Sequence, residues 1–138
     1  MRALPLILVA AALACSDNPA APSPFGASVP ISVTPVDAPA DTARHIYVGF
    51  DKGLMTIHGR IATPDPCYEL SAYRALAGNE LKVTVVATPH RQGCASSLDH
   101  FDYQVLTDTP TCPHLTLWYH YVGVNWPDVK VGEINFLC

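Results

Sequence analysis

Apolar and polar residues alternate with a period of two along much of the chain beyond residue 43. In the clearest example, Leu81, Val83 and Val85 are separated by Lys82 and Thr84. Successive side chains of a β-strand point to opposite faces of its sheet, so this period predicts strands with one buried and one solvated face. Runs of strand-like composition cover residues 44–50, 54–63, 67–76, 81–88, 101–105, 114–122 and 133–138.

Turn-forming residues separate these runs, notably Asp51-Lys52-Gly53 and Pro64-Asp65-Pro66. About seven short strands, each with one polar face, predict an all-β domain, namely a small antiparallel β-sandwich with an immunoglobulin-like architecture. The Cys, Trp and Cys spacing of antibody domains is not met. The resemblance is therefore architectural and carries no function.

One of the runs also fits a helix. Residues 69–78 read ELSAYRALAG, which contains good helix formers, and Gly78 suits the position that follows a helix. Strand alternation places Leu70, Ala72 and Leu76 on one face, with Arg74 as the polar exception. The alternation favours a strand, and the helix remains the alternative.

The N-terminus has the pattern of an export signal. One positive charge at Arg2 precedes an uncharged apolar run over residues 3–14, which is too short to span a membrane. The run ends at Ala12-Leu13-Ala14-Cys15, and this segment resembles the signal peptide and lipobox of bacterial lipoproteins. Ordinary cleavage after Ala14, or a buried helix, are the alternatives.

The lipoprotein resemblance implies that residues 1–14 are removed and that Cys15 is lipidated, which includes a palmitate-type acyl chain. Acyl chains anchor a protein without a spanning helix. The membrane is then a partner, and the domain lies on the non-cytoplasmic side of the bacterial cell envelope. In enteric bacteria, Ser16 at the next position is similar to an outer-membrane sorting signal.

Residues 15–43 have the composition of a tether. Residues 16–43 contain six of the 13 prolines and neither Lys nor Arg. Proline lacks the amide donor that helices and central strands need, so this composition predicts a disordered, extended spacer. Within it, Val29, Ile31 and Val33 alternate with polar residues or proline, which leaves an edge strand over 29–34 as an alternative. The domain is expected at 44–138.

Four cysteines remain after Cys15 is assigned to the membrane. An even number of cysteines in an exported chain predicts two disulfides, and three pairings are possible. We favour Cys67 with Cys94 and Cys112 with Cys138, because the second bridge would hold the last strand at the C-terminus.

Composition narrows the functional classes. The chain has 8 basic and 12 acidic residues, a net charge of −4, and lacks the basic excess of a nucleic-acid binder. We find no catalytic motif and no cofactor fingerprint, and we predict neither an enzyme nor a resident metal. His114 and His120 would share one face of a strand with Cys112, so a periplasmic metal carrier is an alternative.

Aromatic residues gather between positions 118 and 126. Trp118 is expected on the outer face of its strand and Trp126 in a following loop. Exposed aromatic side chains stack on sugars or anchor partners, so these two residues, with Tyr119 and Tyr121, are the candidate binding residues. The expected function is a lipid-anchored envelope protein whose domain binds a partner or has a structural role. A carbohydrate-binding accessory module is the alternative.

Overall fold

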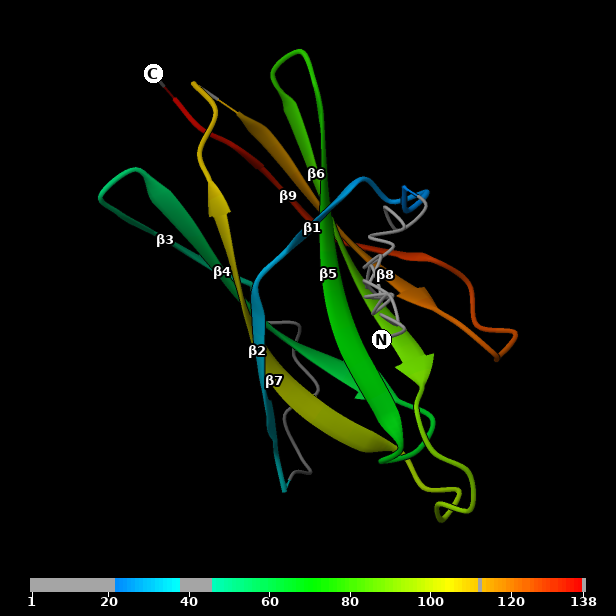
Figure 1. Cartoon of the computed structure of the whole chain (residues 1–138). Coiled ribbons are helices and arrows are strands. Elements are labelled where there is room, and N and C mark those ends of the chain that lie inside the picture. Colours follow the sequence, from blue (N-terminus) through cyan, green and yellow to red (C-terminus); the bar gives the residue numbers. More distant parts are fainter. Residues whose placement is uncertain (1–21, 38–45, 112, 138) are drawn as a thin grey trace, which may run out of the picture.

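The computed structural model describes residues 22–37, 46–111 and 113–137. Over these residues the chain forms nine strands, in an all-β fold (Figure 1). They are β1 (Ala27–Val29), β2 (Ile31–Pro35), β3 (Tyr47–Asp51), β4 (Leu54–Thr63), β5 (Tyr68–Ala77), β6 (Glu80–Pro89), β7 (Asp99–Asp108), β8 (His114–Tyr121) and β9 (Val129–Asn135). The last seven correspond in order to the seven predicted runs, but β9 begins four residues before the predicted run over 133–138 and ends at Asn135.

The strands form two sheets. One has the order β1-β5-β6-β8-β9 and the other has the order β2-β7-β4-β3. All neighbours are antiparallel except β6 and β8, which run parallel. The expectation of a wholly antiparallel fold is therefore wrong at this pair. The reason is that β7 lies in the other sheet, so the chain returns to the first sheet in its original direction.

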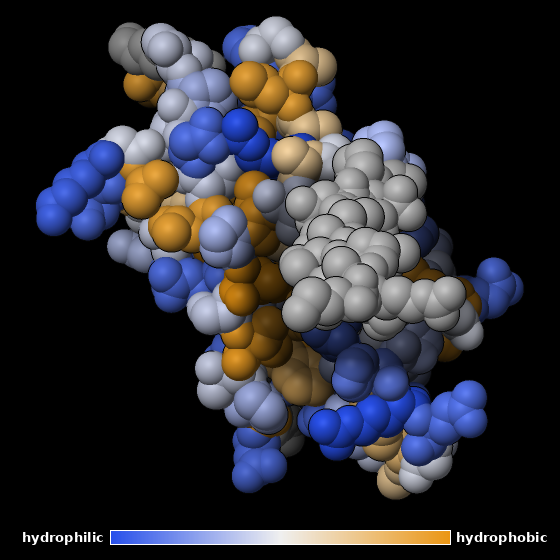
Figure 2. Space-filling model, in the orientation of Figure 1, coloured by the Kyte–Doolittle hydropathy of each residue, from blue (hydrophilic) through white to orange (hydrophobic). Residues whose placement is uncertain are grey.

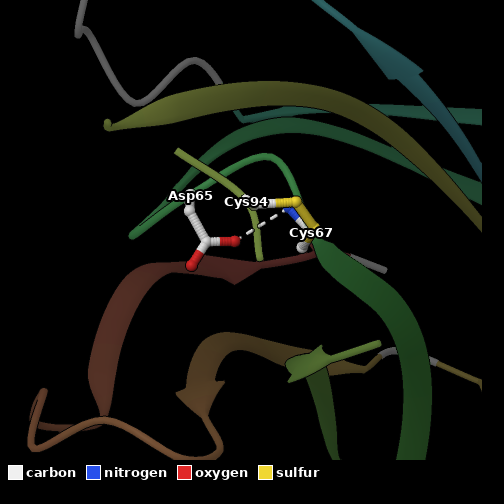
Figure 3. A group of neighbouring side chains, drawn as sticks. All are labelled: Asp65, Cys67 and Cys94. Carbon is white, nitrogen blue, oxygen red and sulfur yellow. Dashed lines mark hydrogen bonds between the residues drawn. A yellow bond between two sulfur atoms is a disulfide. The ribbon is translucent and has the colours of Figure 1, made fainter. Parts of the chain in front are cut away.

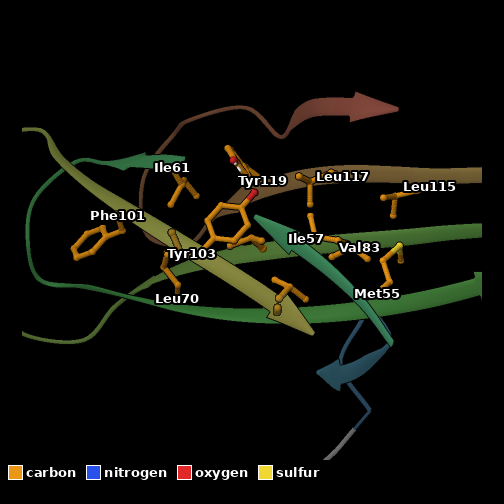
Figure 4. Close-up of a cluster of buried hydrophobic side chains, with 14 of the residues drawn as sticks. Met55, Ile57, Ile61, Leu70, Val83, Phe101, Tyr103, Leu115, Leu117 and Tyr119 are labelled. Carbon is orange, nitrogen blue, oxygen red and sulfur yellow. Dashed lines mark hydrogen bonds between the residues drawn. The ribbon is translucent and has the colours of Figure 1, made fainter. Parts of the chain in front are cut away.

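The core lies between the two sheets, because both contribute buried apolar side chains to one cluster (Figure 4). The predicted inner face of β6 is confirmed, since Leu81, Val83 and Val85 are fully buried. They face Met55 and Ile57 from β4 within the same cluster. Alternation in the sequence was sufficient to identify these positions, although Thr84 and Val86 on the other face of β6 are buried as well.

The segment 69–78 is a strand, and the helical alternative is wrong. All ten residues of β5 pair with β6, from Tyr68 opposite Pro89 to Ala77 opposite Glu80. The turn between them contains Gly78 at a φ of 63°, a left-handed conformation that glycine adopts without steric cost. Leu76 is 51% exposed beside this turn, although alternation placed it with the buried residues.

The fold begins earlier than predicted. β1 pairs with β5, and β2 pairs with β7 over five residues. Pro30 lies between them, where the chain passes from one sheet to the other, and its carbonyl accepts a hydrogen bond from the amide of Leu106. Each strand is at a sheet edge, where proline costs no ladder bond. The prediction of a disordered spacer is wrong for residues 27–35. The edge-strand alternative over 29–34 is confirmed in part, because the segment forms two short edge strands, one in each sheet, instead of one.

Several other predictions fall on residues that the structure does not describe. They concern the signal peptide at 1–14, the lipidated Cys15, the rest of the tether at 16–21 and 38–43, and the Cys112–Cys138 bridge. Among the described residues, no helix has the length and apolar character needed to cross a membrane.

Candidate functional site

The two tryptophans predicted as binding residues do not form one surface. Trp118 is half-buried on the outer face of β8, where the ammonium of Lys82 lies 4.9 Å from its ring centroid. Trp126 packs edge-on against Tyr121, with ring centroids 5.0 Å apart. Because Tyr121 packs against the core on the inner side of β8, the two tryptophans lie on opposite sides of this sheet.

Tyr119 is a core residue and not part of a binding surface. It is 4% exposed, and its hydroxyl donates a hydrogen bond to the carbonyl of Arg60 at 2.9 Å. The prediction that Tyr119 contributes to binding is therefore wrong. Its alternation with Trp118 already placed these two side chains on opposite faces of the strand.

The two histidines of the proposed metal carrier each pair with a carboxylate. Nε2 of His114 lies 2.6 Å from Glu133, and Nδ1 of His120 lies 2.6 Å from Asp128. The six-residue step between them along β8 corresponds to roughly 20 Å at ~3.3 Å per residue. His114 and His120 therefore cannot ligate the same metal ion, which argues against this alternative.

The disulfide between Cys67 and Cys94 confirms one of the two predicted bridges (Figure 3). It joins the residue before β5 to the loop between β6 and β7. Asp65 accepts a hydrogen bond from the amide of Cys67 at 2.8 Å. The sulfur atoms and the carboxylate lie close enough to suggest a metal site. However, both sulfurs are consumed by the disulfide and are not thiolate ligands.

A groove of about 670 Å³ adjoins this disulfide. Ile31 and Val33 of β2 line one side and Leu70 of β5 lines the other. Figure 2 shows an apolar stripe near the middle of the view, where β2 and β5 lie in Figure 1. The ion pair between Glu69 and His90 borders the groove, with Oε2 of Glu69 3.0 Å from Nδ1 of His90.

The outer face of the four-stranded sheet has a different character, because polar side chains form rows across its strands. In the first row, Thr34 of β2 lies opposite Asp102 of β7, which lies opposite Arg60 of β4. Directly opposed residues in an antiparallel pair share a face. Arg60 binds Asp102 through two hydrogen bonds, Nε to Oδ1 at 2.6 Å and Nη2 to Oδ2 at 3.0 Å.

The second row lies two residues away from the first row on β2, β7 and β4, and it also includes a residue of β3. Ser32 is opposite Gln104, Gln104 is opposite His58, and His58 is opposite Tyr47. This row therefore crosses all four strands. Tyr47 at its end is 67% exposed, and its ring centroid lies 5.8 Å from that of His58.

The valley between these two rows contains two adjoining hollows. One of about 240 Å³ is lined by Tyr47, His58, Arg60 and Asp102, together with Gly59 and Tyr103. The other, of about 150 Å³, also reaches His58 and Asp102 and extends to the β2 side chains. The side chain of Tyr103 points into the core, so we infer that Tyr103 lines the hollow with its backbone, which forms the floor of the valley. We call this surface the β2–β3 valley, after the strands at its ends.

The ion pair controls the charge of the β2–β3 valley. The hydrogen bonds from Arg60 hold the pKa of Asp102 below its ordinary value, against a smaller opposing effect of burial. Asp102 is therefore ionised at neutral pH, and its charge is balanced by the guanidinium. The pair leaves the valley with strongly polar walls and no formal charge from these two residues.

The chain matches no protein-family model, no curated protein and no solved structure. The site must therefore be interpreted from its own geometry. Sequence reasoning missed the β2–β3 valley, although Asp102 and Gln104 alternate with the apolar residues Phe101, Tyr103 and Val105 within the predicted run over 101–105. Recognising the rows required the register between β2, β7, β4 and β3, which no local pattern contains.

Proposed function

We propose that the chain is a lipid-anchored protein of the bacterial cell envelope, which displays a small disulfide-stabilised β-sandwich with a binding or structural role. The observation that carries the proposal is the N-terminal sequence, in which an apolar run over residues 3–14 ends at Cys15. The disulfide between Cys67 and Cys94 supports it, because disulfides persist in oxidising compartments outside the cytoplasm.

A second bridge between Cys112 and Cys138 belongs to the same proposal. His114 pairs with Asn135 at one end of the β8–β9 ladder, and the amide of Phe136 donates to the carbonyl of Pro113 at 3.3 Å. Pro113 and Phe136, which are one and two residues away from the two cysteines in sequence, are therefore next to each other. This proximity favours a bridge between Cys112 and Cys138 over two free thiols, because the Cys67–Cys94 disulfide already excludes the other two connectivities that the sequence left open.

The immunoglobulin-like arrangement also remains a proposal. Two sheets with one shared core and the division of the first strands between both sheets support it. The parallel β6–β8 pair departs from an all-antiparallel version of that architecture.

Binding is favoured over a purely structural role by the β2–β3 valley, because an exposed aromatic ring beside several hydrogen-bonding side chains is the chemistry of a recognition surface. The carbohydrate-binding alternative is retained, on this surface and not at Trp118 and Trp126. The metal-carrier alternative lacks such support, since its two histidines are too far apart.

Metabolic labelling with a palmitate analogue tests the anchor. We expect the full-length protein to be labelled and to fractionate with membranes, and both properties to be lost in Cys15→Ser. Ser16→Ala is the matched control, because it changes the neighbouring residue and retains the thiol. Labelling that persists in Cys15→Ser would contradict the lipid anchor. A soluble, unlabelled protein beginning at Cys15 would indicate ordinary secretion.

A further inference from the structure

An accessible aromatic ring lies at one end of the β2–β3 valley. Tyr47 is 67% exposed, and its ring carbon Cε1 lies near Gly49 on the same strand, where a Cβ would be 3.7 Å away. Glycine at this position leaves the ring without a neighbouring side chain on its own strand. Such a ring offers an apolar platform with a polar hydroxyl at its edge.

The hydrogen-bonding groups beside this platform are attached to rigid strands. Gln104 offers an amide, and Ser32 and Thr34 offer hydroxyls, all on exposed outward positions. The bidentate contact with Arg60 fixes the orientation of the Asp102 carboxylate, whose side chain is 48% exposed. The valley therefore holds one carboxylate in a fixed orientation, beside donors and acceptors on strands whose backbone is already in place before a ligand arrives.

The shape of the β2–β3 valley suits an extended ligand. It crosses four strands, and three interstrand spacings of ~4.8 Å give a length of about 14 Å. Its hollows are shallow and open, whereas sites for small molecules enclose most of the ligand surface. A chain of repeating units lying across the strands fits this shape better than a single small molecule.

The charge balance of the valley limits the chemistry of that chain. Arg60 and Asp102 neutralise one another, so neither a polyanion such as nucleic acid nor a phosphate finds the excess of cations that it requires. Pyranose rings have apolar C–H faces that stack on aromatic rings, and their hydroxyls both donate and accept hydrogen bonds. These are the two properties that the valley provides.

We infer that the β2–β3 valley binds a neutral glycan chain, with Tyr47 as the stacking platform and Asp102, Gln104 and His58 as the side chains that contact its hydroxyls. This inference names the ligand class for the binding role proposed above, and it is independent of the lipid anchor. It also moves carbohydrate recognition to the sheet opposite the one that contains Trp118.

Co-sedimentation of the full-length protein with insoluble glycans tests this inference. The probes are cellulose, chitin and curdlan, which are insoluble and uncharged glycans, in a polyoxyethylene detergent, because maltoside detergents present sugars of their own. We expect retention on at least one probe and a loss of apparent affinity of about tenfold or more in Tyr47→Ala. Gln104→Ala, two strands away from Tyr47 in the second row, is expected to weaken binding in the same direction.

Trp118→Ala is the matched aromatic control and should bind as the wild type does. Circular dichroism of each variant establishes that it is folded. No retention on any of the three probes would overturn the inference, as would equal retention of Tyr47→Ala and wild type. A loss in Trp118→Ala with Tyr47→Ala unaffected would place the glycan on the other sheet. Palmitate labelling is measured separately, so the proposed lipid anchor and the proposed glycan site can each fail without the other.

Discussion

The hydroxyl of Tyr119 lies 2.8 Å from the hydroxyl of Tyr103, and the two residues come from opposite sheets. Tyr119 donates its single hydroxyl hydrogen to the carbonyl of Arg60, so Tyr103 must be the donor in the contact between the tyrosines. The rings meet edge to face, with centroids 5.9 Å apart. This chain of hydrogen bonds links the sheets through an otherwise apolar core and reaches the backbone beneath the β2–β3 valley.

Tyr119→Phe is expected to lower the free energy of unfolding by about 1–3 kcal/mol. The change removes the donor to the Arg60 carbonyl and also the acceptor for the buried Tyr103 hydroxyl, and unsatisfied buried polar groups are costly. Urea denaturation followed by tryptophan fluorescence measures the difference. A variant as stable as the wild type would contradict the inter-sheet role of this hydroxyl.

Tyr103→Phe should cost less than Tyr119→Phe. The variant removes a donor, while Tyr119 still donates to Arg60. In the double variant, the costs should not add, because both changes act on one connected network. A double-mutant cycle measures this coupling, and strict additivity would mean that the two hydroxyls act independently.

Gly59→Ala is expected to destabilise the fold by about 1–3 kcal/mol, as overpacking of a core does. Glycine is required there because a Cβ would lie 2.2 Å from the hydroxyl oxygen and 2.5 Å from the Cζ of Tyr103. Gly49→Ala is the matched control, since its Cβ would meet only an ordinary contact at 3.7 Å. Thermal denaturation compares the two, and an equal effect would contradict the steric explanation.

Loss of the disulfide between Cys67 and Cys94 should lower stability by roughly 3–4 kcal/mol, on the loop-entropy model for a separation of 27 residues. The double variant Cys67→Ala/Cys94→Ala tests this by urea denaturation without leaving a single reactive thiol. A loss of stability well below 1 kcal/mol would contradict the prediction, because it would mean that the disulfide does not restrict the unfolded chain as the loop-entropy model assumes.

Stability should fall in acid through the Arg60–Asp102 pair. The folded pKa of Asp102 is below its ordinary value of 3.8, so its contribution is complete above that pH. The contribution is lost as the pH falls through the lower folded pKa. Because the carboxylate is 48% exposed, solvent screening limits this contribution to about 1 kcal/mol or less.

Urea denaturation at pH 7 and at acid pH compares Asp102→Asn with the wild type. The variant should be less stable than the wild type at pH 7, and the difference should shrink below about pH 4. Some acid sensitivity remains in the variant, because Arg74 lowers the pKa of Asp108, and Lys130 lowers that of Glu133. A difference independent of pH would show that Asp102 does not act through its charge.

Much of the local structure could be predicted from alternation alone. The inner positions Val83 and Leu117 are fully buried or nearly so, and the first disulfide joins the cysteines that we favoured. The prediction was wrong for the segment around Ile31, where the proline-rich composition opposes a strand but pairing with another strand stabilises one. The prolines around Ile31 indicated a spacer, but the free edge of β7 accepts this segment as a strand.

The candidate site could be predicted only in part. Asp102 and Gln104 alternate with apolar residues in the sequence, but sequence reasoning selected Trp118, because an aromatic residue was expected there on the outer face of its strand. The structure instead places Tyr47 beside His58, with Gln104 on the neighbouring strand, where several polar groups meet. These residues are far apart in sequence, so no window of the chain contains them together.

The sequence by itself determined most of the side chains that face the core in the central strands, because a two-residue period is a local property of an extended chain. It also contains the apolar N-terminal run and Cys15, on which the proposed anchor rests. Only the tertiary structure decided which strands are neighbours, that β6 and β8 run parallel, and that Tyr119 closes the hydrogen-bond chain to Arg60. Strand order and register depend on contacts between distant segments, and the β2–β3 valley exists only because four such segments align in one sheet.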